Sequence, residues 1–429
     1  MTFESVAIIG GGESGVGAAI LAKSKGKEVF LSEYGKLTDR YKAELEAHNV
    51  PYEEGGHSIE KLKEFELVVK SPGVADQTKV IKGLNDYKVP IISEIEFGFY
   101  YTEVGIIGIT GSNGKTTTTG LIYHLLKEAG VHAQVGGNIG KSFARLVYED
   151  EPCEVYVLEL SSFQLDGIKD FRPDIAVLLN ITPDHLDRYD YDFENYVKSK
   201  WRIAMNQTSE DLLVYNADLA LRNNEPRSIA IGEEEIKNNQ LSTESGKIFD
   251  TTNTTLKGKH NRFNALCAIQ VVERFGLSDA DIQKGLETFV NEAHRLQVVA
   301  IKNGVTYIND SKATNVDAVF YALDAMEGNV VWIVGGTDKG NDYEPILKLV
   351  NDKVVKKIYL GIDNTKLKEV FGEGSEVESM KEAVKAASKS AKKGDVVLLS
   401  PACASFDLFK NYIDRGEQFI AAVKSLGEE

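Results

Sequence analysis

Short apolar runs that alternate with segments of helical spacing constrain the fold of this chain more than any other feature. The runs are rich in Val, Ile and Leu and lack strict alternation of apolar and polar residues, which is typical of strands buried on both faces of a parallel sheet. They are 6–9, 28–31, 67–69, 105–109, 155–159, 175–180, 305–309, 330–334, 357–360 and 396–399. Strands and helices in this alternation predict an α/β protein.

The chain has 429 residues, which predicts about three domains at roughly 150 residues each. Residues 1–96 open with a glycine-rich turn, and residues 97–296 open with a strand followed by TGSNGKTTTT. A third set of strands begins near QVVAIKNGVTYIND and defines residues 297–429. The polar stretch 232–257 predicts a hairpin or a surface excursion within the second domain.

The charge balance excludes some classes of partner. There are 49 Lys and Arg against 65 Asp and Glu, a net charge of −16, which argues against a nucleic-acid binder or a protein of anionic membranes. The three cysteines are far apart and form no CxxC, so we expect a reducing compartment without disulfides or zinc. Neither a signal peptide nor an 18-residue apolar stretch is found, and we expect a cytoplasmic protein.

The segment Thr110-Gly-Ser-Asn-Gly-Lys-Thr116 follows an apolar strand and precedes a helical pattern. Glycines there let backbone N–H groups face a polyphosphate, Lys115 adds a positive charge, and the Thr116 hydroxyl can bind Mg²⁺. The strict phosphate-loop pattern requires glycine at 109, where this chain has Ile109. The alternative interpretation is a glycine turn before a helix.

Further polar residues follow the neighbouring strands. Glu159 ends an apolar strand, and its carboxylate is either a Mg²⁺ ligand or a capped strand end. His185 follows the next strand and is a less usual ligand for that ion. Lys200 could be a solvated helix residue, and the Asn138 amide could orient a phosphate or form an Asx-turn.

The first and last domains carry candidate sites as well. The first turn fits GxGxxG and Glu33 ends the next strand, which indicates a dinucleotide site, the diphosphate of a nucleotide-sugar, or only a tight turn. In the last domain, strand-end loops carry polar residues that could receive a small dicarboxylate: Lys312, Thr314, Lys339 and Ser405. Arg295, before this domain, could contact a phosphate or form a surface ion pair.

Together these motifs resemble the Mur ligases, ATP-dependent enzymes that form amide bonds in peptidoglycan precursors. The resemblance covers the whole chain through GGGESG, SPG, TGSNGKTTT, GGNIG, LELSSFQL, NITPDHLDRY, KSKWRI, GKHNRFNALCA, HRLQ, NDSKATN, GGTDKG and SPACASFDLF. TGSNGKT without the leading glycine is the family's own variant. The resemblance implies Rossmann-like N- and C-terminal domains around a central P-loop-type ATPase domain. It also implies a monomer that joins D-glutamate to UDP-N-acetylmuramoyl-L-alanine through an acyl phosphate, with ATP and two Mg²⁺.

The resemblance also implies roles for individual residues. Positions matching the UDP-substrate site are Ser14, Glu33 and Ser71, and those matching a substrate or metal-shell role are Asn138 and Ser161. Positions matching ATP contacts are Gly111, Ser112, Asn113, Gly114, Lys115, Thr116, Thr117, Asn264, Arg295, Asp310 and Lys312. Catalytic or metal-binding positions are Lys115, Thr116, Glu159, His185 and Lys200, the last as a carbamylated lysine. Positions matching the amino-acid pocket are Thr314, Lys339, Ser405, Phe406 and Phe409.

Several alternatives remain at this point. Relatives that add L-alanine, a diamino acid or a dipeptide share these motifs, but a DNPR-like motif of the diamino-acid enzymes is absent from this chain. Folylpolyglutamate synthases usually begin near the ATP loop, whereas roughly 100 residues precede it here. An NAD-dependent oxidoreductase leaves Lys115, Thr116, Glu159 and His185 unexplained, and a non-catalytic nucleotide sensor does not require all of them.

Overall fold

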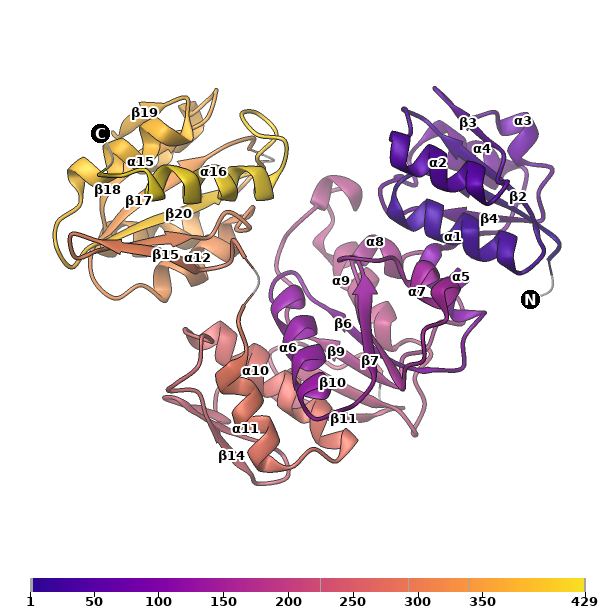
Figure 1. Ribbon diagram of the computed structural model, residues 1–429, viewed down its shortest axis with the longest axis horizontal. Coiled ribbons are helices and arrows are strands. Elements are labelled where there is room, and N and C mark those ends of the chain that lie inside the picture. The colour runs from indigo at the N-terminus through magenta and orange to yellow at the C-terminus, as the bar shows by residue number, and fades with distance from the viewer. Residues whose placement is uncertain (1–2, 224, 292, 339, 428–429) are drawn as a thin grey trace. The chain divides into compact units, whose positions relative to one another are not determined.

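The computed structural model describes residues 3–223, 225–291, 293–338 and 340–427, and it divides the chain into two compact units. The first unit comprises Met1–Thr252 and Phe263–Thr288, and the second comprises Asn253–Arg262 and Phe289–Glu429. Figure 1 shows the helices and strands of each unit.

The first unit begins with a five-stranded parallel sheet in the order β3-β2-β1-β4-β5. Its strands are β1 (Ser5–Ile9), β2 (Glu28–Glu33), β3 (Tyr52–Glu54), β4 (Leu67–Lys70) and β5 (Ile91–Ser93). Its helices are α1 (Glu13–Ser24), α2 (Asp39–Ala47), α3 (Ile59–Leu62), α4 (Lys79–Asp86) and α5 (Glu94–Phe99). This strand order places the glycine turn after β1 at the topological switch point of the sheet, where the strand order reverses. Doubly wound folds bind their ligands at this point.

A second, six-stranded parallel sheet follows in the order β11-β10-β9-β6-β8-β7. Its strands are β6 (Gly105–Thr110), β7 (Ala133–Gly137), β8 (Val155–Glu159), β9 (Ile175–Leu178), β10 (Leu212–Asn216) and β11 (Arg227–Ile231). Helices along this part are α6 (Lys115–Glu128), α7 (Phe143–Glu149), α8 (Ser162–Leu165), α9 (Phe193–Trp201), α10 (Lys259–Val272) and α11 (Asp279–Thr288). The carboxyl ends of β6, β8 and β9 therefore lie side by side at one edge of the sheet.

The predicted excursion at 232–257 is a small antiparallel sheet of β12 (Ile236–Lys237), β13 (Gln240–Ser242) and β14 (Ile248–Asp250). It therefore contains one strand more than a hairpin.

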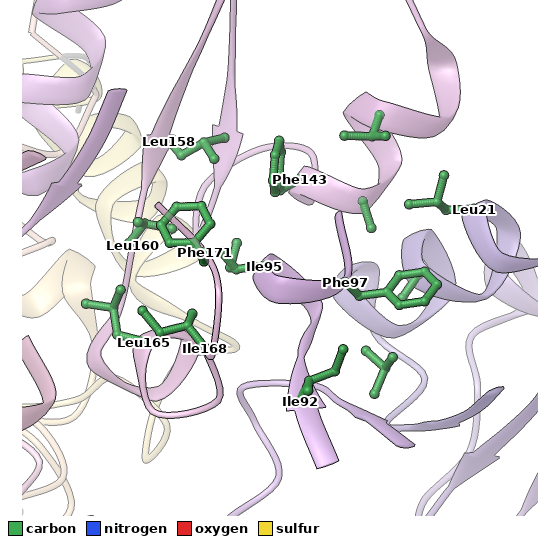
Figure 2. Close-up of a cluster of buried hydrophobic side chains, with 14 of the residues drawn as sticks. Leu21, Ile92, Ile95, Phe97, Phe143, Leu158, Leu160, Leu165, Ile168 and Phe171 are labelled. Atoms are coloured by element: carbon green, nitrogen blue, oxygen red, sulfur yellow. The ribbon is translucent and has the colours of Figure 1, made fainter. Parts of the chain in front are cut away.

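One hydrophobic core joins the two parallel sheets of the first unit. Figure 2 shows Ile95 and Phe97 of α5 in one cluster with Leu21 of α1 and Phe143 of α7, and all four side chains are buried. The predicted boundary at 96/97 falls inside α5, a helix that belongs to this shared core. The division into three domains stays a prediction.

Buried carboxylates accompany this core. Glu96 is fully buried, and its two oxygens accept hydrogen bonds from the backbone N–H groups of Lys169, Asp170 and Phe171 at 2.8–2.9 Å. Glu94 is equally buried, and its Oε1 accepts from Ala144 N at 2.6 Å. These bonds tie α5 to α7 and to the loop before β9.

The second unit contains a six-stranded sheet in the order β15-β16-β20-β17-β18-β19, parallel except for the β15–β16 pair. The strands are β15 (Gln297–Lys302), β16 (Val305–Asn309), β17 (Val330–Gly335), β18 (Val354–Leu360), β19 (Ser375–Val377) and β20 (Val396–Ala402). Its helices are α12 (Val316–Asp324), α13 (Leu347–Lys353), α14 (Thr365–Phe371), α15 (Met380–Ser390) and α16 (Tyr412–Lys424). Core clusters lie on both faces of this sheet, as expected for strands buried on both sides.

The α/β prediction is confirmed, and each predicted apolar run coincides with a strand. Within the described residues, no helix is long and apolar enough to cross a bilayer.

Replacing Glu96 tests the junction within the first unit. Glu96→Ala leaves three buried N–H groups without an acceptor, so we expect the thermal unfolding midpoint to fall by about 5 °C or more. Glu103→Gln, at an exposed glutamate in the following loop, is the control and should shift the midpoint by about 1 °C or less. An unchanged midpoint for Glu96→Ala would contradict this role.

The buried carboxyl group of Glu94 should make the free energy of unfolding depend on pH. Burial raises the pKa of Glu94 from 4.5 to about 8, so the folded state holds this proton more tightly than the unfolded state. Its contribution is therefore fully present below pH 4.5 and is lost as the pH rises through about 8. We expect Glu94→Gln to raise the unfolding midpoint relative to wild type at about pH 8.5 but not at about pH 4.5. Equal differences at the two pH values would contradict the assignment.

Candidate functional site

The predicted phosphate loop connects β6 to α6 with the required backbone geometry. Gly111 has φ +159° and Gly114, the residue before α6, has φ +85°. A Cβ on Gly114 would lie 2.5 Å from Asn264 Oδ1, and one on Gly111 would lie 3.0 Å from Leu179 Cβ. Both positions therefore require glycine for conformation and for space.

The segment after β9 holds this loop in place. Ser112 N donates to Asn180 O at 2.9 Å, and Asn113 N donates to the Asn180 side chain at 2.8 Å. The Ser112 hydroxyl is 2.9 Å from both the backbone N and the backbone O of Thr182, and 3.2 Å from Tyr196 OH. The loop is thus fixed before any ligand binds.

Two lysines meet at one carbonyl of this loop. Lys115 Nζ donates to Gly111 O at 2.8 Å and to Ser112 O at 2.9 Å, and Lys200 Nζ donates to the same Gly111 O at 2.8 Å. Lys115 is half-buried in the first turn of α6, and the neighbouring Thr116 and Thr117 are buried. The N-terminus of α6 and Lys115 together favour an anion.

Lys200 lies on α9 and is only 1% exposed, whereas Lys198 on the same helix is exposed. Its Nζ lies 4.7 Å from the centre of the Tyr196 ring. Burial, and then the positive charge of Lys115, lower the pKa of Lys200 well below its usual value. A neutral amine at this position is nucleophilic, which a carbamylated lysine requires.

Glu159 at the end of β8 has the features of a cation ligand. It is 2% exposed, its Oε1 accepts from Asn138 Nδ2 at 2.8 Å, and its Oε2 is buried without a hydrogen-bond partner. A buried carboxylate oxygen that lacks a donor is costly unless it meets a cation. The residues here therefore fit a hard divalent ion such as Mg²⁺.

His185 lies in the loop after β9 with φ +52°, in the left-handed region. Its ring packs edge-on against the Phe163 ring with the ring centres 5.2 Å apart, and the Arg188 guanidinium carbon lies 4.2 Å from the centre of the same Phe163 ring. Ser161, before α8, forms a capping box with Gln164. In the described ranges, no group of three or more His, Cys, Asp and Glu side chains is arranged to hold a metal.

The first glycine turn is tightly built. A Cβ on Gly15 would lie 1.8 Å from Gly10 O, so α1 packs directly on the turn. Glu33 binds the turn through Gly11 N at 2.6 Å and binds Gly35 N at 2.7 Å. Ser71 Oγ donates to Gly10 O at 3.3 Å, and Ser14 is half-buried on α1.

Asp310 is a buried acid of the second unit. Its carboxylate accepts from Leu296 N at 3.1 Å and from Ser400 Oγ at 2.9 Å, and burial raises its pKa to about 7. Lys312 Nζ lies 5.6 Å from the Tyr412 ring, and Arg295 Nε is buried without a hydrogen-bond partner.

The residues predicted to form the amino-acid pocket differ widely in their exposure to solvent. Ser405 is 2% exposed and Phe409 is part of a core cluster, whereas Phe406 is 72% exposed. Thr314 is half-buried. Lys339 lies outside the described residues. The assignment of these side chains to an amino-acid pocket stays a prediction.

The sequence analysis did not identify some of the residues that hold these loops together. Arg415 on α16 is 1% exposed and donates to Ser311 O at 2.8 Å, to Ser311 Oγ at 3.0 Å and to Cys403 O at 3.2 Å. It thereby joins two of the loops predicted to receive the amino acid. Asn180 and Tyr196 were also missed, because neither stands in a pattern that separates it from an ordinary loop or helix residue.

Comparison with known proteins agrees with this geometry. Models of the MurD N-terminal domain, the Mur ligase middle domain and the Mur ligase glutamate ligase domain match residues 5–80, 109–272 and 294–403. A UDP-N-acetylmuramoylalanine–D-glutamate ligase of Christiangramia forsetii is 49% identical over 99% of this chain and 100% of that protein. The chain belongs to the Mur ligase family. A relative of the same name from Bacteroides fragilis is 47% identical, covering 98% of this chain and 99% of its own.

Two solved structures of peptide or Mur ligases share the fold. A MurF ligase from Thermotoga maritima in complex with ADP has a TM-score of 0.63 at 16% identity, covering 92% of this chain and 94% of its own. A pseudomurein peptide ligase from Methanothermus fervidus has a TM-score of 0.61 at 19% identity, covering 98% and 100%. The predicted family and fold class are confirmed, and the oxidoreductase alternative is wrong.

The phosphate-loop assignment predicts the effect of removing Lys115. Lys115→Ala should reduce ATP turnover at least about a hundredfold, because one charge-stabilising donor is lost. Its thermal unfolding midpoint should stay within about 2 °C of wild type. Lys127→Ala, at the exposed end of α6, is the matched control and should turn over ATP normally. Normal turnover by Lys115→Ala would refute the assignment.

The difference in burial between the two lysines of α9 yields another prediction. Lys200→Ala should lose at least about tenfold in activity and recover part of it with small carboxylates such as formate. Lys198→Ala should be fully active, since its ammonium group is exposed. If Lys200→Ala is unimpaired, this lysine has no part in the site.

Proposed function

We propose that this protein joins D-glutamate to UDP-N-acetylmuramoyl-L-alanine with hydrolysis of ATP to ADP and phosphate, in peptidoglycan precursor synthesis. The observation that carries the proposal is full-length similarity at 49% identity to a ligase of that name. The rigid phosphate loop, with Lys115 at the N-terminus of a 14-residue helix, supports ATP as the co-substrate.

The residues of the first unit would serve the phosphoryl transfer. The alanyl carboxylate attacks the γ-phosphorus of ATP, the bond to the β,γ-bridging oxygen breaks, and ADP leaves. Lys115 and the N–H groups of the phosphate loop stabilise the charge that spreads over the transferred group. The D-glutamate amine then displaces phosphate from the acyl phosphate and gives up a proton.

Thr116, Glu159, His185 and a carbamylated Lys200 would hold two Mg²⁺ ions. Bound Mg²⁺ would neutralise negative charge on the phosphate oxygens. The unpartnered Oε2 of Glu159 and the lowered pKa of Lys200 support this donor set.

Under this proposal, residues 1–96 bind the UDP moiety through Ser14, Glu33 and Ser71, with Asn138 and Ser161 nearer the reacting carboxyl. Residues 97–296 bind ATP, assisted by Asn264 and Arg295, and Asp310 and Lys312 contact its ribose and phosphates. Residues 297–429 bind D-glutamate through Thr314, Lys339, Ser405, Phe406 and Phe409. We also propose a cytoplasmic monomer, and the net charge of −16 supports the expectation of no nucleic-acid or membrane partner.

Phosphate release from ATP and Mg²⁺ tests the proposal directly. The mixtures contain UDP-N-acetylmuramoyl-L-alanine with D-glutamate, with L-glutamate or with no amino acid. We expect release only with D-glutamate, together with a product heavier by one glutamyl residue. Release with L-glutamate alone would retain the ligase and change the substrate, and no release in any mixture would refute the proposal.

A further inference from the structure

A buried serine joins a histidine and a glutamate at the carboxyl ends of β2 and β3. Ser32 is fully buried, and its Oγ lies 2.6 Å from Glu53 Oε1 and 2.7 Å from His57 Nδ1. Ser32 and Glu53 are paired across the two parallel strands, so their side chains share one face of the sheet. Neither His57 nor this contact belongs to the residues assigned above.

The single proton of the Ser32 hydroxyl decides the state of the imidazole. Ser58 donates to Glu53 from its backbone N at 2.9 Å and from its hydroxyl at 2.7 Å, and these bonds with that of Ser32 lower the pKa of Glu53 despite its partial burial. An ionised carboxylate only accepts, so Ser32 must donate to Glu53. The hydroxyl can then only accept from His57, whose Nδ1 therefore carries the hydrogen.

His57 is thus a neutral ring with a fixed tautomer. Burial lowers the pKa of His57, so the ring stays uncharged at neutral pH. With the hydrogen on Nδ1, the lone pair is on Nε2, which makes no hydrogen bond within the described part of the chain. The loop therefore carries a hydrogen-bond acceptor on Nε2 of His57.

This trio is not the catalytic triad of a hydrolase. In such a triad the imidazole takes the proton of the serine, and the carboxylate binds the other ring nitrogen. Here the Ser32 proton goes to Glu53, and the hydroxyl is fully buried. The arrangement orients His57 and provides no nucleophile.

His57 lies beside an exposed aromatic ring at the edge where β1 carries the glycine turn. Tyr34 is 75% exposed, and its ring centre lies 5.9 Å from that of His57. The loop before His57 is fastened to the loop after β2, since Gly55 N donates to Gly35 O at 2.9 Å. β3 is two strands from β1, or about 10 Å, a span that one ribose and its phosphates can cover.

We propose that His57 reads the imide N–H of a uracil ring through Nε2 and that Tyr34 supplies the surface on which the ring stacks. Uracil carries a hydrogen at N3, whereas cytosine has a lone pair there and would face the Nε2 lone pair. His57 therefore selects uridine over cytidine nucleotides. The inference deepens the proposed function, on which it rests for a uridine nucleotide as ligand, by naming the residues that determine base specificity.

Calorimetric titration of the full-length protein with UDP and with CDP tests this inference. We expect wild type to bind UDP about tenfold more tightly than CDP, the size of one directed hydrogen bond. His57→Ala should lose about tenfold in UDP affinity, keep its CDP affinity and so lose the preference. Tyr34→Ala should weaken both ligands equally, because stacking does not depend on the identity of the base.

His48→Ala is the matched control, because both ring nitrogens of His48 are already bonded, to Glu44 O and to Tyr148 OH. Both affinities should be unchanged in this variant. A second readout is the ¹⁵N spectrum of the His57 ring, which should show hydrogen on Nδ1 in wild type and a mixture of tautomers in Ser32→Ala.

Each outcome distinguishes the two proposals. If His57→Ala keeps the preference for UDP, or if the hydrogen is on Nε2, the base-reading role is refuted while ligase activity stands. If wild type prefers UDP but makes no ligase product, the proposed function fails and the base-reading role stands.

Discussion

Two lysine side chains that donate to the same glycine carbonyl define the chemistry of the central sheet. Lys115 Nζ and Lys200 Nζ both lie 2.8 Å from Gly111 O. Burial, and then repulsion by the positive charge of Lys115, lower the pKa of Lys200 well below its usual value. One carbonyl of the loop thus accepts hydrogen bonds from Lys115 and from a second, buried lysine whose pKa is lowered.

The rest of the first unit keeps this arrangement rigid. The ends of three neighbouring parallel strands supply Gly111, Glu159 and Asn180, so groups far apart in sequence are held together by the ladder of the sheet. Asn180 binds the phosphate loop from the side, and Asn138 holds one oxygen of Glu159 while the other stays without a donor. Such preorganisation is the main contribution of a protein to phosphoryl transfer.

The sequence predicted most of the central strands and the phosphate loop, because continuous apolar runs and glycine spacing are local signals. The strands β3, β5, β7, β10, β11 and β19 were not predicted, and all of them except β10 lie at the edge of a sheet. Most are short or partly exposed and lack such a run. Burial also separates Lys200 from Lys198, and His57 from any other loop histidine, only after the chain has folded. These distinctions depend on tertiary packing, which no spacing in the sequence contains.

The shared core around α5 limits how freely the parts of this chain can be exchanged. Glu96 serves backbone groups of the loop 169–171, and Phe97 packs within the same cluster as Phe143. A recombination event that exchanged the N-terminal domain at residue 96 would separate an acid from its donors and half of a core from the other half. Successful exchange between relatives would therefore have to carry α5, α7 and the loop 167–171 together. The segment that can be exchanged is thus larger than the N-terminal domain that is predicted to bind the ligand.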